Sequence, residues 1–512
     1  MASGTNFGVL FLIGFLIKSG IAQTSYNAAV IEYAKSSDSS VSDLDNMMLR
    51  LRDYESLISN LKSSNIIVFP EYGLTTPYLP ENLEPLSTFV PDPAENISPC
   101  STKDSYEKVL IDLSCTAQTH GVFVVVNLIE KSISSSNTTI FYNTNVVFNG
   151  SGTVVARYRK INLCKEPKFT KGENVATFTA FGVNFGLMTS CDLLYEHPAR
   201  TMLANTNVTD IIYPHAWVAE TPFLHSLSIQ DGFAKANGIN LLSATYRNSS
   251  DGMGGFGIFS AKSATTSLDI STGISYKSST GNLEKLTNKM PEAVCNNNIE
   301  ITPRIGGVPP SIDKFNNTIE NLNLYTTKDL VVTDNIAKVQ ICSEGSLFCC
   351  DFYVEFQDGY ASSNSPVYKV AAFYGTKQVN ITGKNLGFRT CALLVCANND
   401  LQSCGETPPD SSPIKQISLQ ANLPKGDRTL YMPSTLKKDL HPLTGYAFCQ
   451  NVEGDVIGTT MSANNVEKLW TFGIVGRVYD LDDRPEGRGT ASYFRSGFGL
   501  ILMLIATQFF FQ

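Results

Sequence analysis

The sequence predicts an α/β domain followed by a β-rich second domain that is stapled by disulfides. Between Ala28 and Tyr246, short apolar runs alternate with segments of helical periodicity, which is typical of central sheets with outer helices. From about Asn296 to Gly476 the chain changes to short strands, Pro and Gly turns and most of its cysteines. With 512 residues and 43% hydrophobic content, it can bury a large core and divide into two domains.

The first domain is expected to alternate strands with three helices. The first helix repeats its apolar residues at helical spacing, and Ser42 with Asp45 can form a capping box at its start. Asn149-Gly150 marks a turn between two strands. The helices are expected at residues 44–61, 106–117 and 224–237. The strands are expected at residues 28–33, 66–69, 122–128, 145–148, 154–158, 185–189, 210–213 and 239–244.

Three polar residues stand at the ends of apolar strands, where α/β folds place their functional sites. Glu71 follows Ile-Ile-Val-Phe-Pro, Lys160 follows the strand that ends near Tyr158, and Cys191 follows a third strand. Each has an ordinary structural explanation alone: a loop cap, a member of a basic cluster, or a buried or disulfide-bonded cysteine. Together they offer the base, the cation and the thiol that nucleophilic attack on an amide requires.

These segments resemble the Glu-Lys-Cys motifs of the nitrilase superfamily of carbon-nitrogen hydrolases. The motifs are Pro70-Glu71, Arg157-Tyr-Arg-Lys160 and Cys191-Asp192. Within the superfamily, the chain is similar to the vanin and biotinidase branch over nearly its whole length. That closer similarity rests on Tyr213-Pro-His-Ala-Trp217, Cys342 with Cys349-Cys350, Tyr368-Lys-Val-Ala-Ala-Phe373, Thr390-Cys-Ala-Leu-Leu-Val-Cys396 and Cys404-Gly405.

The resemblance implies an α-β-β-α sandwich as the fold of the first domain. It also implies that Glu71 is the general base, Cys191 the nucleophile and Lys160 the stabiliser of the tetrahedral intermediate. The expected substrate is a small linear amide, such as pantetheine or a biotin amide, hydrolysed through a thioester. No metal and no organic cofactor is expected.

The local sequence around the expected nucleophile, Ser190-Cys191-Asp192, departs from the family pattern of Cys-aromatic-Asp. A gapless alignment on Phe185-Gly186, Asp192 and Pro198-Ala199 puts Ser190 in the nucleophile slot instead of Cys191. Neighbouring side chains on an extended segment point in opposite directions, so a shift of one residue could aim the thiol away from Glu71. Two functions therefore stay open: a surface amidase that uses Cys191 or Ser190, and a catalytically silent protein that binds or adheres.

The count of twelve cysteines limits these alternatives. If Cys191 is a free nucleophile, at least one other cysteine must be unpaired, and Cys164 is the candidate. Alternatively, Cys191 pairs with Cys164 or with another cysteine, which would remove the nucleophile. Asp192 is expected to hold the turn in place through hydrogen bonds to nearby backbone.

Both ends of the chain are hydrophobic and indicate a secretory route. The run 7–17 and the small-x-small pattern Gly20-Ile-Ala22 predict a signal peptide over 1–22, although a buried N-terminal strand is the alternative. The mature chain then divides into residues 23–290 and 296–480. Residues 487–512 resemble a glycosylphosphatidylinositol (GPI) signal whose tail is cleaved, with a single membrane span as the alternative. The attachment candidates are Gly487, Gly489 and Ser492.

Seven Asn-x-Ser/Thr sequons agree with an oxidising, glycosylating route that ends on the outer face of the cell membrane. They lie at Asn96, Asn137, Asn149, Asn207, Asn248, Asn316 and Asn380. The net charge of -8 and the absence of a long basic run argue against nucleic acid as a partner. The expected partners are a small amide and, through the anchor, the membrane.

Overall fold

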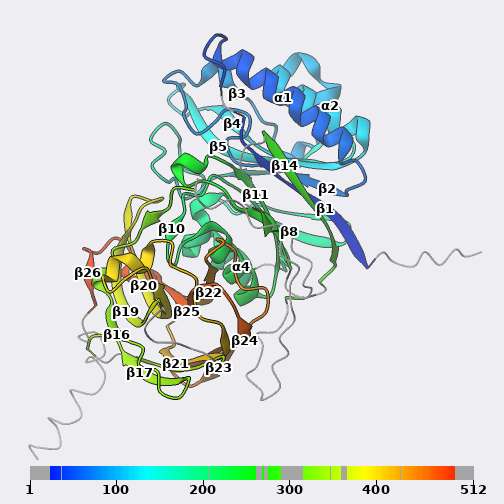
Figure 1. Cartoon of the computed structure of the whole chain (residues 1–512). Coiled ribbons are helices and arrows are strands. Elements are labelled where there is room, and N and C mark those ends of the chain that lie inside the picture. Colours follow the sequence, from blue (N-terminus) through cyan, green and yellow to red (C-terminus); the bar gives the residue numbers. More distant parts are fainter. Residues whose placement is uncertain are drawn as a thin grey trace, which may run out of the picture.

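The computed structural model describes the chain from residue 24 to residue 489 with several gaps. The gaps are residues 36, 206, 261–267, 270–274, 287, 290–314, 346–347, 359–365 and 427. An α/β part and a β-rich part, each with its own sheets, lie against one another (Figure 1). The predicted signal peptide, the boundary near 290–296 and nearly all of the predicted anchor signal lie outside the described residues, so these stay predictions.

The strands of the α/β part form one continuous path in the order β6-β5-β4-β2-β1-β11-β9-β8-β7. In chain order their bounds are β1 Ser25–Tyr33, β2 Ile66–Val68, β4 Phe123–Ile133, β5 Thr139–Phe148, β6 Val154–Arg159, β7 Thr177–Ala180, β8 Val183–Leu187, β9 Asp210–His215 and β11 Asn240–Tyr246. Shorter or edge strands join this path: β3 Ser87–Thr88, β12 Phe256–Phe259, β13 Leu268–Asp269 and β14 Tyr276–Glu284. The predicted strands are all present, although β4 and β5 extend further than expected.

The path folds back so that its two halves face one another. β1 and β11 pair in parallel only at their last residues, Glu32 with Thr245 and Tyr33 with Tyr246, and then diverge. Phe123 of β4 stacks on Phe178 of β7, with ring centroids 6.3 Å apart, although these strands lie near opposite ends of the path. A shared apolar layer therefore fills the space between the halves.

Helices cover the outer face of each half. Helices α1 (Asp43–Asn60) and α2 (Lys108–His120) pack on one half, and α4 (Ser226–Asn237) packs on the other (Figure 1). This arrangement is the α-β-β-α layering that the family resemblance implied. The short helix α3 (Thr201–Asn205) and the turn that contains Ser190 join the second half.

Helix α1 shows how local sequence sets these boundaries. The hydroxyl of Ser42 accepts a hydrogen bond from the Asp45 backbone N–H at 3.1 Å, which confirms one half of the predicted capping box, and the Asp45 carboxylate accepts from the Ser42 hydroxyl at 2.7 Å. Met47, Leu51 and Tyr54 form part of a stripe that is buried against the sheet.

The β-rich part is a sandwich of two sheets around its own apolar core. One sheet holds β16 Thr326–Asp329, β19 Val367–Val379, β20 Lys384–Cys396, β22 Thr429–Lys437, β25 Leu469–Val478 and β26 Gly487–Arg488. The other holds β17 Ile336–Cys342, β18 Cys349–Phe356, β21 Ile414–Pro424, β23 Ala447–Glu453 and β24 Val456–Val466. The disulfide Cys350–Cys391 connects β18 to β20 and so ties the two sheets together.

The two parts meet along α4 and β22. Gly232 of α4 lies so close to β22 that a Cβ on it would come 2.1 Å from the carbonyl oxygen of Pro433. The short strand β10 (Glu220–Thr221) also pairs with β15 (Thr318–Ile319) across the same seam. One apolar core cluster contains residues from both parts, among them Phe233 and Met432.

The predicted surface modifications stay predictions. Asn96, Asn137, Asn207 and Asn316 are exposed, whereas Asn149, Asn248 and Asn380 are half-buried. Gly487 lies in β26, which pairs with β19, and the Gly489 N–H donates to the Tyr374 carbonyl at 2.9 Å; Ser492 lies outside the described residues. Across the part of the chain that the structure describes, we find no helix with both the length and the apolarity to span a bilayer.

Candidate active site

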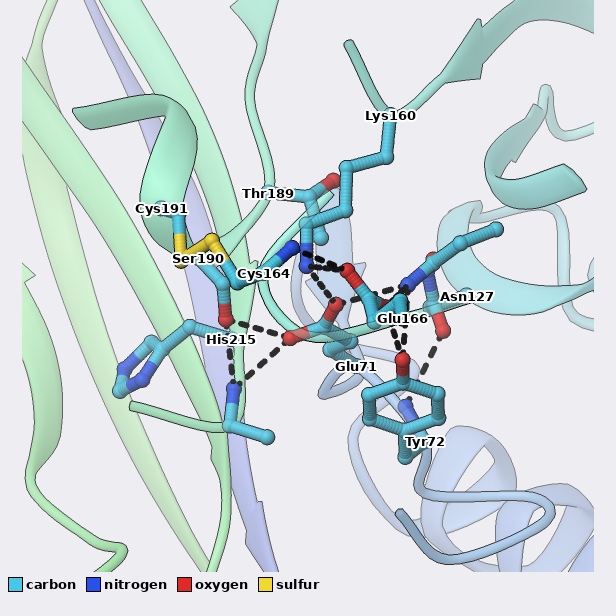
Figure 2. Close-up of polar contacts among 12 residues, drawn as sticks. Glu71, Tyr72, Asn127, Lys160, Cys164, Glu166, Thr189, Ser190, Cys191 and His215 are labelled. Atoms are coloured by element: carbon cyan, nitrogen blue, oxygen red, sulfur yellow. Dashed lines mark hydrogen bonds and ion pairs between the residues drawn. A yellow bond between two sulfur atoms is a disulfide. The ribbon is translucent and has the colours of Figure 1, made fainter. Parts of the chain in front are cut away.

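Residues that follow four different strands converge on one pocket of about 220 Å³ (Figure 2). Glu71 follows β2, Lys160 follows β6, Ser190 follows β8 and Ala216 follows β9. The predicted side chains Glu71 and Lys160 are thus brought together at the ends of buried strands, as the sequence indicated.

A buried ion cluster lies at the base of the pocket. The Nζ of Lys160 is 2.8 Å from Glu71 Oε1 and 2.7 Å from Glu166 Oε2, and Lys160 is only 2% exposed. Tyr72 donates its hydroxyl proton to Glu166, and the Cys164 backbone N–H donates to the same carboxylate at 3.0 Å. Because a single ammonium group pairs with two carboxylates, one of the two carboxylates can take up a proton at a modest cost in free energy.

The two carboxylates are inequivalent in their affinity for that proton. Burial raises the pKa of Glu71, and the nearby Glu166 charge adds to the effect, although Lys160 opposes it. Burial also acts to raise the pKa of Glu166, but Lys160 and the hydrogen bonds to this carboxylate bring it below its usual value. Burial opposes the charge of Lys160, yet the two carboxylates hold its pKa above the ordinary value. Glu71 is therefore the better proton acceptor of the pair.

A row of buried asparagines orients this cluster. The amide of Asn127 donates to Asn143 Oδ1 at 2.6 Å and to Asn145 Oδ1 at 3.0 Å. Asn143 in turn donates to Glu71 Oε1 at 2.8 Å and contacts Glu166 at the same distance. Asn145 donates to the Thr189 hydroxyl at 2.9 Å, next to Ser190. The row links the carboxylates to the turn that carries the nucleophile slot.

Ser190 occupies the position that faces Glu71. Its hydroxyl donates to Glu71 Oε2 and accepts from the Ala216 backbone N–H at 3.0 Å. The backbone of Ser190 has φ of 43°, in the left-handed region, which turns the side chain into the pocket. The Tyr213 hydroxyl holds this turn by donating to the Ser190 carbonyl at 2.7 Å.

Asp192 braces the same turn, as the sequence predicted. Its carboxylate accepts from the backbone N–H groups of Thr189 at 3.0 Å and Asn162 at 2.9 Å, and from the Tyr158 hydroxyl at 2.6 Å. Burial raises the pKa of Asp192 to about 6, against the effect of these donors. Because Asp192 uses these contacts to hold the turn, it has a positioning role.

The expectation of a free thiol at Cys191 is corrected by the structure. Cys191 is fully buried and forms a disulfide with Cys164, which was the candidate for an unpaired cysteine. The left-handed turn at Ser190 points consecutive side chains in different directions, so only Ser190 reaches Glu71 (Figure 2). The alternative register, with Ser190 in the nucleophile slot, is therefore the one that the geometry favours.

Several polar residues of the site escaped sequence reasoning. Glu166 follows the Lys160 segment by six residues but belongs to no strand end. Asn143 and Asn145 are two residues apart in β5, so both side chains lie on one face. The signal that could have revealed them is a polar residue inside a buried strand, such as Asn127 in Phe123-Val-Val-Val-Asn-Leu-Ile129. Among the described residues, no group of His, Cys, Asp and Glu is arranged to hold a metal ion.

Comparison with known families and proteins agrees with this architecture. Residues 27–255 match the carbon-nitrogen hydrolase family, and residues 315–482 match the vanin C-terminal domain. Vanin-like protein 1 of Drosophila melanogaster is 30% identical, over 92% of this chain and 90% of its own length. The human pantetheine hydrolase VNN2 is 27% identical, with 95% of each chain covered. Biotinidase of Bos taurus is 28% identical, over 74% of this chain and 78% of its own length.

Proposed function

The chain belongs to the vanin and biotinidase branch of the carbon-nitrogen hydrolase (nitrilase) superfamily, and from this we propose that it hydrolyses a small linear amide with Ser190 as the nucleophile. The observation that carries the proposal is the hydrogen bond from the Ser190 hydroxyl to Glu71, whose other oxygen is paired with Lys160. The relatives named for pantetheine and biotin suggest amides of that size as substrates.

The reaction divides into acylation and deacylation. Glu71 takes the Ser190 proton as the oxygen attacks the amide carbon, and the Lys160 ammonium stabilises the oxyanion that forms. The C–N bond then breaks, Glu71 returns the proton to the leaving amine, and the acyl group stays on Ser190 as an ester. Glu71 next activates a water molecule that hydrolyses the ester.

Turnover by such a site is expected to be slow. A serine hydroxyl is far harder to deprotonate than a cysteine thiol, and the base that contacts Ser190 is the Glu71 carboxylate. The raised pKa of Glu71 reduces this mismatch, since a stronger base accepts the proton more readily.

The test compares Ser190→Ala and Ser190→Cys, both made with Cys164→Ala and Cys191→Ala so that no new disulfide can form. Release of the amine from pantetheine and from a biotin amide is measured against the double alanine background. We expect S190A to abolish release and S190C to raise it by at least about a hundredfold, because a thiol suits a carboxylate base. Equal release by the background and by S190A would contradict the proposal.

A second function, ligand binding without turnover, is favoured by one observation. Cys191, which directly follows Ser190, forms a disulfide with Cys164, so it has no free thiol in this state. In that case the wild type and S190A would bind pantetheine with equal affinity by calorimetry, and neither would release amine.

The disulfides suggest an extracellular protein, and the proposed location is the outer face of the cell membrane. Removal of residues 1–22 and replacement of the C-terminal tail by a GPI anchor near residues 487–492 would place it there. Treatment of expressing cells with a phosphatidylinositol-specific phospholipase C is expected to release the protein. Retention on the cells would favour the single membrane span.

A further inference from the structure

We propose that the disulfide between Cys164 and Cys191 makes the pocket a covalent acceptor for small aliphatic thiols. Both cysteines line the pocket that holds Glu71 and Ser190. The proposed hydrolysis uses neither sulfur, so this bond is a reactive group that the site carries without a catalytic task. The proposal concerns the same pocket but does not depend on hydrolysis.

The two cysteines of this bridge differ in burial, and that difference gives the exchange a direction. Cys191 is fully buried, whereas Cys164 is half-buried and lies on the loop after β6. A thiol that enters the pocket therefore meets the sulfur of Cys164 first. Access decides which sulfur of a disulfide is attacked, so Cys164 becomes the acceptor and Cys191 the leaving group.

The lining of the pocket suits a short aliphatic thiol. Val218, Met253 and Ile381 supply apolar surface for an alkyl chain. Lys165, next to Cys164, also lines the pocket and forms no ion pair with any acidic residue that the structure describes. The Lys165 ammonium donates a hydrogen bond to the Asn380 amide oxygen at 3.2 Å, and its positive charge favours the thiolate form of a ligand, which is the attacking species.

The exchange is balanced without an external oxidant. The ligand thiol loses its proton to solvent, and its sulfur forms a bond to Cys164 Sγ as the bond between Cys164 and Cys191 breaks. The electron pair of that bond goes to Cys191, which takes up a proton and becomes a thiol. The protein therefore gains the full mass of the ligand thiol, and the reverse reaction releases the ligand and restores the bridge.

Four other disulfides with both cysteines among the described residues provide internal controls. Cys350–Cys391 and Cys396–Cys404 are buried, so they are protected from any thiol in solution. Cys100–Cys115 and Cys342–Cys349 are half-buried, like Cys164, but they do not line this pocket. If exposure alone governed exchange, these two bridges would react as fast as Cys164–Cys191.

The experiment incubates the full-length folded protein with N-acetylcysteamine, then unfolds it in the presence of N-ethylmaleimide so that buried thiols are blocked as well, and locates the adduct by mass spectrometry. We expect one ligand per chain, attached to Cys164, with the maleimide on Cys191. Modification there should be at least about tenfold faster than at Cys100–Cys115 or Cys342–Cys349.

Two variants separate this proposal from the proposed hydrolysis. S190A should capture N-acetylcysteamine at the wild-type rate, because the exchange does not use the serine hydroxyl. Replacing both Cys164 and Cys191 by alanine should abolish capture. Equal modification of the other half-buried bridges, or capture by the double variant, would each overturn the proposal, whatever the hydrolysis assays give.

Discussion

At the scale of single residues, the site depends on one ammonium group that serves two buried carboxylates. Lys160 contacts both Glu71 and Glu166, and all three side chains are nearly or wholly buried. Removing one partner of a buried ion pair is far more damaging than removing a surface charge, because the remaining charge has no water to solvate it. Lys160 should therefore matter for stability as well as for chemistry.

Lys160→Met is expected to lower stability in a way that depends on pH. Without the ammonium, both carboxyl pKa values in the folded protein rise above those in the unfolded chain, so stability is retained in acid and lost as pH rises from the unfolded values through the folded ones. At pH 8 we expect a loss of roughly 3–5 kcal/mol, and a smaller loss at pH 5. Urea unfolding midpoints at the two pH values measure the difference.

Lys165→Met is the matched control for that experiment. Lys165 lines the same pocket but is exposed, and its ammonium contacts the Asn380 amide oxygen at 3.2 Å. Its removal should leave the urea midpoint nearly unchanged at both pH values. A similar loss in the two variants would mean that the buried ion cluster does not have the proposed effect.

The residues at strand ends could be predicted from the sequence pattern, whereas the register of the nucleophile turn was left open between Cys191 and Ser190, with Ser190 indicated only by the family alignment. Glu71 and Lys160 follow apolar strands, and a buried strand fixes the position of the residue after it. Ser190 and Cys191 lie on a turn whose direction is set by distant groups such as the Tyr213 hydroxyl. That contact joins residues 23 apart in the chain, so no local pattern reports it.

At the scale of elements, the close approach of α4 to β22 depends on a glycine. A methyl group on Gly232 would overlap the Pro433 carbonyl oxygen, which lies only 2.1 Å from the position of the added Cβ. Gly232→Ala should therefore separate the helix from the strand and destabilise the protein by about 1–3 kcal/mol, despite the better helix propensity of alanine. Thermal unfolding measures the loss.

The control for Gly232→Ala is the same substitution at a glycine that has space for a methyl group. The nearest atom to an added Cβ on Gly458, in β24, is 3.7 Å away, which is ordinary van der Waals contact. Gly458→Ala should leave the melting temperature within a degree or so of the wild type, because surface changes of this kind have small effects. A larger loss in G458A than in G232A would refute the packing argument.

The strand β10 carries a carboxyl group whose protonation affects the seam between the two parts. Glu220 is buried and accepts the Asn380 N–H at 2.9 Å. Burial, reinforced by the charge of Glu320 and opposed by Lys377, raises the pKa of Glu220 from 4.5 to about 7. A raised carboxyl pKa means that stability falls as pH rises from the unfolded value to the folded one.

Glu220→Gln should remove this pH dependence, because the amide oxygen can still accept the Asn380 N–H while carrying no charge. Relative to the wild type, the variant should gain up to about 3 kcal/mol at pH 8 and nothing below pH 4.5. Unfolding midpoints measured from pH 4.5 to 8 give the two curves. Parallel curves across that range would rule out Glu220 as their cause.

Helices and strands whose apolar residues repeat at a regular spacing could be predicted from the sequence. Polar strands at the edge of a sheet could not. Helix α1 has a buried stripe of apolar residues and a side-chain cap, and both are specified by residues that are neighbours in the sequence. The edge strand β14 (Tyr276–Glu284) buries only two of its nine residues, yet it pairs along the whole of β1. Its stability comes from backbone hydrogen bonds to a partner about 250 residues earlier, which composition does not reveal.

At the scale of the whole molecule, the sequence predicted two domains, but the structure joins them through a common core. One apolar cluster includes Phe233 and Leu227 of the first part together with Met432, Trp470 and Val475 of the second. Neither part can lose the other without exposing these side chains to water.

Unfolding is therefore expected to be a single cooperative transition despite the length of the chain. Apolar surface shared between the parts couples their stabilities, since the unfolding of either exposes the face of its partner. Differential scanning calorimetry on the intact protein should give one peak, and G232A should shift that peak as a whole. Two resolved peaks in the wild type would show that the parts unfold independently.

The tip of the hairpin formed by β19 and β20 reaches the pocket from the second part. Asn380 and Ile381 line the pocket, although every group that contacts the Ser190 hydroxyl comes from the first part. The pocket lining is thus shared: Val218 and Met253 come from the first part, and Asn380 and Ile381 from the second. A substitution at Asn380 or Ile381 can therefore alter the lining of the pocket without replacing any group that contacts the Ser190 hydroxyl.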